Sequence, residues 1–391
     1  MKKKILAIYS SLIVLGCTTA PSITKQIDRD YQKDELIELE INYTDSEINV
    51  LQINEKNFPN PLPLQKINNN KWVFRSPQAV SRGTILSINQ SEVKFPIICQ
   101  ISEDDEFVTA QIGNQEILKY AISVQNPPDS LPTYYSRSGF IHPLKTMKGQ
   151  TLTAGFPKGH VHQHGIFHAW TRTHVRDSMI DFWNQQARLG DIRHKELLAI
   201  NHGPVFSEFK VLLEYLAFIG DDTLITSHET WGIRIFPLAG QYVLDWNIQQ
   251  ENISPDTLKI DEYHYGGAAF RGSESWNVEG GAYDSLVFVK TAEGKNATTG
   301  NHSRPKWITI HGVTEAGYGG IAMIQHPLNF RYPQPVRIHP TMPYVCFAPM
   351  VIGSFDLAPE EVYTANFRIL IFDGKPDENE IEKYAQTYQM E

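Results

Sequence analysis

The spacing of apolar residues limits the fold of this chain most, because they alternate with polar residues in short runs. Such runs, separated by Asn, Pro and Gly, are typical of half-buried strands joined by turns. They are rich in β-branched and aromatic residues, as in "LIELEINY", "KWVFRS", "GQYVLDWNIQQ" and "YTANFRILIFDG". Because the strand-like runs are not separated by crossover helices, the pattern predicts an all-β fold with antiparallel sheets.

We expect two β domains. Residues 35–103 are predicted to form a small β-sandwich, and residues 104–391 a large antiparallel β-sandwich. The acidic segment "SEDDE" at 102–106 marks either the boundary or a solvated turn. Residues 18–34 are polar and are predicted to be a tether.

The N-terminus resembles a bacterial lipoprotein signal peptide. Three lysines precede the apolar run "ILAIYSSLIVLG", which is too short to span a bilayer stably and ends at Cys17. The segment "VLGC" resembles a lipobox, so we expect cleavage after residue 16 and lipidation of Cys17. An ordinary buried helix is the alternative. Thr18 follows the cysteine where an aspartate would favour the inner membrane, which implies an outer-membrane anchor in the bacterial cell envelope.

Composition excludes some classes of protein. The chain has 391 residues, 41% of them hydrophobic, and its net charge of -9 is dispersed without a basic face, so no nucleic-acid partner is expected. Besides Cys17, Cys99 and Cys346 are the only cysteines, which leaves open whether they are bridged. The clearest helical pattern is the tail "PDENEIEKYAQTY", with its apolar residues on one face.

The segment "FPKGHVHQHGIFHAW" is the strongest candidate for a functional site. If it is extended, His160, His162 and His164 lie on one face of a strand. Three imidazoles there could bind a divalent metal, supply a proton donor or acceptor to a polar substrate, or make only structural hydrogen bonds. No cofactor is required by the pattern, and the metal is an alternative.

Three other segments combine Arg, His and carboxylate groups with Gly or Pro, which indicates loops or strand ends that can carry function. "YYSRSGFIHPL" contributes Arg137 and His142, and "DEYHYGGAAFRGSESWN" contributes His264, Arg271 and Glu274. "IQHPLNFRYPQPVRIHP" contributes His326, Asn329, Arg331, Arg337 and His339. Trp170, Trp183, Trp276 and Trp307 could stack on sugar rings or pack in the core.

One apparent motif fails on inspection. The segment "HETWG" begins like the zinc-binding pattern HExxH, but Gly232 stands where the second histidine must be. A zinc metalloprotease is therefore not predicted.

The histidine segment and two of the loop segments also carry a family resemblance. "YYSRSGFIHPLKTMKGQTLTAGFPKGHVHQHGIFHAW", "YHYGGAAFRGSESW" and "GGIAMIQHPLNFRYPQPVRIHP" resemble the bacterial PmoA-like domain family, over about residues 110–375. The chain departs from the family pattern at Gly159, where an aspartate usually precedes the first histidine. Members are often labelled methane oxygenase, but that activity belongs to a multi-helix membrane protein, and this chain has no transmembrane run after its signal.

The resemblance implies a secreted protein of polysaccharide-degrading bacteria, with a large β-supersandwich similar to galactose mutarotase. We therefore predict a periplasmic, carbohydrate-active enzyme (a lyase, epimerase or glycoside-cleaving protein) that acts on an oligosaccharide. His160 or His162 would be the acid or base and Glu274 the partner carboxylate. The remaining candidates would bind substrate: Arg137, His142, His164, His264, Arg271, His326, Asn329, Arg331 and Arg337. A non-catalytic glycan-binding lipoprotein and a His-ligated mononuclear metalloenzyme are the alternatives.

Overall fold

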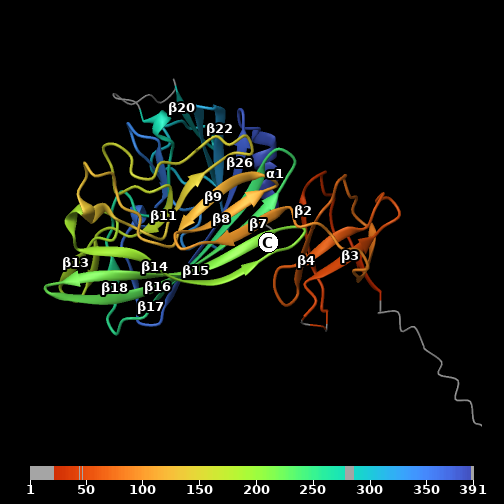
Figure 1. Cartoon of the computed structure of the whole chain (residues 1–391), viewed down its shortest axis with the longest axis horizontal. Coiled ribbons are helices and arrows are strands. Elements are labelled where there is room, and N and C mark those ends of the chain that lie inside the picture. The colour runs from red at the N-terminus through yellow and green to blue at the C-terminus, as the bar shows by residue number, and fades with distance from the viewer. Residues whose placement is uncertain (1–21, 44, 46, 278–285, 389–391) are drawn as a thin grey trace, which may run out of the picture.

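The structure, a computed structural model, describes residues 22–43, 45, 47–277 and 286–388. The predicted signal peptide at 1–17 and its Cys17 lie outside these residues. Within the described ranges the regular structure is antiparallel β-sheet, apart from short 3-10 turns and one α-helix near the C-terminus (Figure 1). The predicted all-β sandwich is confirmed. No helix in the described part of the chain is long and apolar enough to span a bilayer.

The first six strands form a small domain (Figure 1). They lie in one hydrogen-bonded sheet in the order β1-β6-β3-β4-β5-β2 and enclose their own core, which includes Leu51, Leu64 and Trp72. The strands are β1 (Ile23–Gln26), β2 (Leu36–Glu40), β3 (Val50–Asn54), β4 (Leu62–Lys66), β5 (Lys71–Arg75) and β6 (Ile85–Gln90).

Both predicted boundaries of the small domain shift. The predicted tether contains β1, which pairs with β6 through Ile23 and Ile88. β1 is an edge strand with no fully buried residue, so its sequence is polar and does not show the apolar alternation that would predict a strand. At the other end, β7 (Cys99–Glu103) forms a hairpin with β8 (Phe107–Ile112) in the large domain. "SEDDE" is the hairpin turn, in which the Asp104 carboxylate accepts the N–H groups of Glu106 and Phe107.

The large domain contains two eight-stranded antiparallel sheets. Sheet 1 has the order β23-β24-β19-β11-β10-β9-β8-β7, and its further strands are β9 (Gln115–Ala121), β10 (Ile141–Leu144), β11 (Ile166–Ala169), β19 (Gly267–Arg271), β23 (Val336–Ile338) and β24 (Tyr344–Phe347). Sheet 2 has the order β14-β15-β16-β17-β26-β22-β21-β20. Its strands are β14 (Gly190–Asn201), β15 (Ser207–Ile219), β16 (Asp222–Pro237), β17 (Tyr242–Asn252), β20 (Val287–Thr291), β21 (Trp307–Thr314), β22 (Gly317–Gln325) and β26 (Val362–Asp373).

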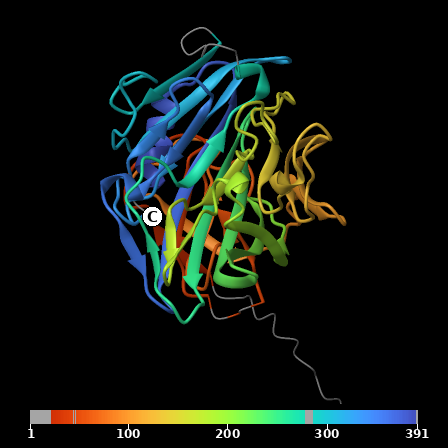
Figure 2. The same cartoon turned by 90° about the vertical axis from the view of Figure 1, so that its left-hand side faces the viewer.

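A four-stranded sheet, β13-β12-β18-β25, completes the large domain. Its strands are β12 (Thr173–Val175), β13 (Ser178–Ile180), β18 (Leu258–Ile260) and β25 (Phe355–Leu357). In the view turned by 90°, the small domain lies behind the large one (Figure 2).

The two large sheets pack on a shared aromatic core. Tyr120 of sheet 1 meets Trp231 of sheet 2 edge-on at 5.9 Å between ring centroids, and Phe347 stacks on Phe367 at 5.5 Å. All four side chains are fully buried. Each such side chain contributes about 1.5–3 kcal/mol on burial, so this layer fixes which face of every strand points inward. The other face of each sheet is left for polar residues.

A buried polar cluster spans the same core. The Glu229 carboxylate accepts hydrogen bonds from the Tyr215 hydroxyl at 2.8 Å, the His168 ring at 2.7 Å and the Trp231 indole at 2.6 Å. His168, from the histidine segment, and Glu229, from the "HETWG" segment, are thus both core residues. The carboxylate is tolerated there because donors surround it.

The C-terminal helix α1 (Glu378–Tyr388) and the small domain cover one end of sheet 2. The predicted helix is confirmed, and its predicted apolar face, Ile381, Tyr384 and Ala385, is buried. These residues share a core cluster with Leu36 and Val73 of the small domain. Cys99 and Cys346 are buried and both are free thiols.

Gln65 of β4 makes hydrogen bonds that link the small domain to the large one. Its side-chain oxygen accepts the backbone N–H groups of Val205 at 2.9 Å and Phe206 at 3.0 Å, and its amide nitrogen donates to the Phe206 carbonyl at 3.0 Å. A Cβ atom on Gly203 would come within 2.2 Å of the Gln65 side chain. Only a glycine therefore allows this close approach.

We predict that Gln65→Ala lowers the free energy of unfolding by about 1–3 kcal/mol, because it leaves buried backbone groups without partners. Urea denaturation followed by tryptophan fluorescence measures the change. Gln90→Ala, at an exposed position of β6, is the matched control and should change stability by less than about 0.5 kcal/mol. Equal stability of both variants and the parent would contradict this role of Gln65.

Candidate functional site

The outer face of sheet 1, turned away from sheet 2, forms the floor of a polar pocket. Side chains alternate along a strand, so Phe270 and Val345 enter the core while Arg271 and Tyr344 lie on the other face, where the two residues are paired in register. Arg337 on β23 pairs with Cys346 and extends the same face. Arg271 is fully buried at the edge of this floor.

Four loops wall the pocket, which has a volume of about 210 Å³. They are the β10–β11 loop, the segment between β13 and β14, the β18–β19 loop and the β23–β24 turn. The lining residues are His160, His162 and Gln163; Trp183, Asn184 and Gln186; His264 and Tyr265; and Arg337, His339 and Tyr344. None of these described lining residues is acidic.

The part of the histidine segment that carries His160, His162 and His164 is a loop, and only its end, Ile166–Ala169, forms a strand, β11. Gly159 has φ of 88° and Gly165 has φ of 53°, and these positive values turn the chain where a side chain would be strained. A Cβ atom on Gly165 would also lie 2.0 Å from the Ile141 carbonyl oxygen. The expected alternation of three imidazoles on one face therefore does not occur.

His160 and His162 stay together, with 5.5 Å between ring centroids, but His164 points elsewhere. Its Nδ1 lies 2.7 Å from the Gly155 carbonyl oxygen and its Nε2 3.0 Å from the Gln185 side-chain oxygen, in a fully buried position. The three predicted histidines thus do not form one ligand set. In the described part of the chain, no group of three or more His, Cys, Asp or Glu residues is placed to hold a metal ion.

The pocket imidazoles are neutral at neutral pH. Burial, aided by His160, Arg137 and Arg271, lowers the pKa of His162 to about 3. Burial, with His160 next, lowers the pKa of His339 to about 4, and burial also lowers the pKa of His160 and His264. The positive charge of the site therefore rests on the guanidinium groups.

His339 is a defined hydrogen-bond donor. Its Nδ1 accepts the backbone N–H of Thr341 at 3.2 Å, so in the neutral ring the proton is on Nε2. The ring meets His160 edge-on, with 5.3 Å between centroids. The backbone of the β23–β24 turn thus sets the tautomer at the pocket.

Several buried polar atoms of the lining make no hydrogen bond. They are Nδ1 of His160, Oε1 of Gln163 and the hydroxyl of Tyr344, whose polar neighbour is the Cys346 thiol. Burial raises the pKa of Tyr344 well above its ordinary value, so it is a neutral phenol. Buried polar atoms without a hydrogen-bond partner are rare in folded proteins and are typical of sites that bind a ligand or ordered water.

Arg137 lies behind the pocket wall. It is fully buried over the Phe167 ring, 5.3 Å from the centroid, and its three guanidinium nitrogens make no hydrogen bond among the described residues. Phe167 in turn contacts Trp183 of the lining, at 4.7 Å between centroids. Arg137 therefore adds positive potential to the site without touching its opening.

The predicted partner carboxylate, Glu274, lies outside the pocket. It is exposed, and its Oε1 accepts the backbone N–H of Lys158 at 3.1 Å, while Asn277 donates to the Lys158 carbonyl at 3.2 Å. Glu274 is thus placed to position the loop that carries His160 and His162 rather than to face a substrate.

Four other predicted substrate-binding residues are also elsewhere. His142 pairs with the Thr153 hydroxyl at 3.0 Å, and Asn329 bonds the backbone of Asn366. Arg331 donates to the carbonyls of Pro349, Gly353 and Ser354 and so fixes a loop. His326 lines a different cleft. These residues contain the right functional groups, but His142, Asn329 and Arg331 are engaged by other parts of the chain, outside the pocket.

No sequence pattern indicates five of the lining residues, Gln163, Asn184, Gln186, Tyr265 and Tyr344. Tyr265 stood beside the selected His264, and its hydroxyl receives the Asn184 amide at 2.8 Å. Asn184 follows Trp183 in a segment with no distinctive pattern, so only the folded chain reveals it. His339 was noted within a cluster but given no role, and Trp183 was expected either to stack on a sugar ring or to pack in the core.

Comparison with known proteins gives one result. No curated protein matches the chain. Residues 108–386 match a family described as "Family of unknown function (DUF6807)", a span that takes in almost all of the large domain. The match does not test the resemblance to PmoA-like proteins, which stays a prediction. Because it covers well over half of the chain, the protein belongs to the DUF6807 family of unknown function.

Proposed function

We propose that the pocket binds an acidic sugar and that the protein is a carbohydrate-active enzyme of the lyase or epimerase type. The observation that supports this most is the lining itself: the Arg337 guanidinium, four imidazole rings, unsatisfied buried polar atoms and no acidic side chain among the described residues. Such a lining favours an anion that also offers hydroxyl groups, and a uronate unit of an oligosaccharide has both.

The chemistry we propose begins with proton removal beside the uronate carboxylate. Arg337 would pair with the carboxylate, which stabilises the negative charge that develops when the neighbouring C–H bond breaks. His160 would take the proton, since its ring is neutral and its Nδ1 has no hydrogen bond. In a lyase, the bond from the next carbon to the glycosidic oxygen then breaks, and the Tyr344 hydroxyl protonates the leaving oxygen. In an epimerase, the Tyr344 hydroxyl would instead donate a proton to the opposite face of the same carbon, while His160 keeps the one it removed.

Hydrolysis is less well supported by this lining. Most glycosidases need two carboxyl groups on either side of the bond, about 5–9.5 Å apart. The candidate Glu274 is engaged with the loop backbone, and the described lining offers no other carboxylate. Elimination and epimerisation need only a base, a proton donor and a group that neutralises the substrate's charge.

A non-catalytic glycan-binding protein is the second candidate. The observation that favours it is the low pKa of His162, about 3, which makes that ring a weak base. The same donors would then bind an acidic glycan without reaction. With the predicted lipobox, either version would act at the bacterial outer membrane, where Cys17 would anchor the chain.

We predict that His160→Ala and Tyr344→Phe each lower kcat by about 10²- to 10⁴-fold on uronate-containing oligosaccharides, because each removes a proton-transfer group. Ultraviolet absorbance of the unsaturated product, or exchange of the substrate proton with solvent deuterium, measures the reaction. His228→Ala, at a partly exposed position of β16 outside the pocket, is the matched control, and thermal unfolding verifies that the variants fold.

Glu274→Gln separates loop positioning from acid–base chemistry. The glutamine keeps an oxygen that can accept the Lys158 N–H, so we expect kcat within about tenfold of the parent. Loss of turnover in Glu274→Gln with full activity in His160→Ala and Tyr344→Phe would overturn the assignment. Binding of uronates without product in all proteins would favour the glycan-binding candidate.

We also predict an unusual pH dependence. The pocket imidazoles have pKa values below the ordinary 6.5, so they stay neutral, and able to accept a proton, as the pH falls through that value. The profile of kcat/KM should therefore remain level from about pH 8 to below pH 6 and fall only at lower pH. Protonation at lower pH adds positive charge, so calorimetry should show tighter uronate binding. An acidic limb centred on 6.5 would contradict the buried site.

A further inference from the structure

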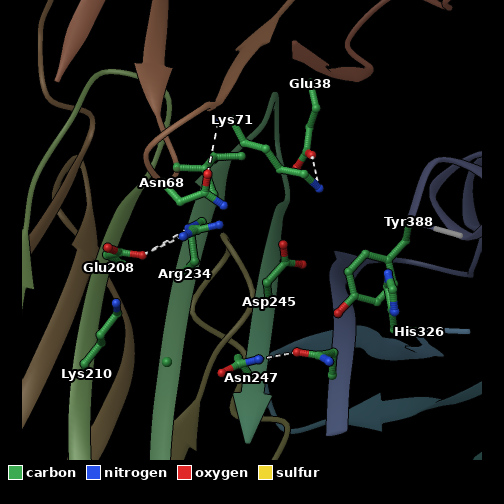
Figure 3. A pocket seen from close by; sticks show the side chains of 13 residues that line it. Glu38, Asn68, Lys71, Glu208, Lys210, Arg234, Asp245, Asn247, His326 and Tyr388 are labelled. Atoms are coloured by element: carbon green, nitrogen blue, oxygen red, sulfur yellow. Dashed lines mark hydrogen bonds and ion pairs between the residues drawn. The ribbon is translucent and has the colours of Figure 1, made fainter. Parts of the chain in front are cut away.

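A second cleft lies on the outer face of sheet 2, on the opposite side of the sandwich from the imidazole pocket (Figure 3). Its volume is about 310 Å³. The floor comes from β15, β16, β17 and β26 of the large domain. The small domain supplies one wall through Glu38, Asn68 and Lys71, and His326 and Tyr388 close the side near α1 (Figure 3).

Two rows of paired residues cross the floor. They share the outward face of their strands, because the intervening residues, such as Trp231 and Trp246, enter the core. The first row is Lys210, Gly232, Asn247 and Asn366, and the second is Glu208, Arg234, Asp245 and Arg368.

Gly232 creates the hollow. It lies in the middle of the long strand β16, where a side chain would otherwise rise between Lys210 and Asn247. A Cβ atom there would meet only the Asn247 Cβ, at 3.6 Å, which is an ordinary contact. Packing does not require this glycine, and a glycine inside a strand is typical of a surface that something else approaches closely.

The charges of the cleft balance one another. Arg234 binds Glu208 through two nitrogens at 3.1 and 2.9 Å, and Arg368 binds Asp245 at 2.7 and 2.8 Å. Lys71 lies 3.4 Å from Glu38. The lining holds three basic residues, Lys71, Lys210 and Arg234, and three acidic ones, and the buried Arg368 in the floor adds one positive charge, so the cleft has little net charge to attract an ion.

The remaining groups offer donors and acceptors side by side. Asn247 and Asn366 are hydrogen-bonded to each other across the floor, and His326 accepts the Leu328 N–H through Nδ1, which leaves its proton on Nε2. Arg368 packs 4.3 Å from the centre of the Tyr388 ring, whose hydroxyl end points into the cleft (Figure 3). A ligand whose groups both donate and accept matches these walls, and sugar hydroxyls do so.

We propose that this cleft binds a neutral saccharide of one or two rings by hydrogen bonding, and that the bound sugar bridges the two domains. The volume is at the lower end of the range for ligand pockets, about 300–1,000 Å³. The proposal goes beyond the imidazole pocket and does not depend on its activity. It gives His326 a ligand-binding role in a site other than the one the sequence predicted.

Gly232→Gln tests the proposal, because glutamine fills the hollow at a position whose backbone and surroundings accept a side chain. Thr230→Gln is the matched control: it puts the same side chain on the same face of β16, one row further along and outside the cleft lining. The probes are the neutral disaccharides cellobiose, xylobiose, maltose and lactose, with glucuronic acid and glycylglycine for comparison. Calorimetry and thermal shift measure binding to the full chain.

We expect at least one neutral disaccharide to bind the parent and Thr230→Gln and to raise their Tm, while Gly232→Gln binds it at least about tenfold more weakly. Arg337→Gln should leave this binding unchanged, which separates it from failure of the acidic-sugar pocket. The proposal is overturned if no neutral disaccharide binds the parent, if only glucuronic acid or glycylglycine binds, or if Gly232→Gln binds as the parent does.

Discussion

The packing of two long antiparallel sheets on one aromatic layer determines where this protein can hold functional groups. Every strand that contributes Trp231, Trp246, Phe347 or Phe367 to the layer must send its neighbouring side chains outward. On sheet 1 the outward residues include Arg271, Tyr344 and Arg337, and on sheet 2 they include the charged rows around Gly232. Both candidate sites are therefore on outer faces, with the core between them.

The two sites differ in how their charges are arranged. In the imidazole pocket, the Arg337 guanidinium has no matching carboxylate in the lining, Arg137 and Arg271 add positive potential from outside it, and burial keeps the rings neutral, so the site favours an anion. In the cleft beside the small domain, the lining holds three basic and three acidic residues, and the buried Arg368 in the floor adds only one further positive charge. In the functions we propose, one side of the molecule would hold a charged sugar unit and the other side uncharged ones.

Much of the fold could be predicted from the sequence, because period-2 patterning is a direct readout of a sheet with one buried face. The C-terminal helix was equally readable from its apolar face. The strand β1 was missed because an edge strand needs no fully buried residue. For the site, the sequence correctly indicated His160, His162, His264 and Arg337. It could not show that His164, Glu274 and Arg331 are hydrogen-bonded to groups elsewhere in the chain, because those partners come close only when the chain folds.

The junction between the domains affects how a fragment of this protein would behave if it were limited to the family match. The family match begins at residue 108, after the small domain and after β7. A fragment cut there would leave the edge of β8 bare and would uncover the apolar surface around Phe206 and Phe236 that Leu36 and Val73 now shield. An unpaired strand edge next to exposed apolar surface favours aggregation. The small domain thus covers apolar surface of the sandwich that would otherwise be in contact with solvent.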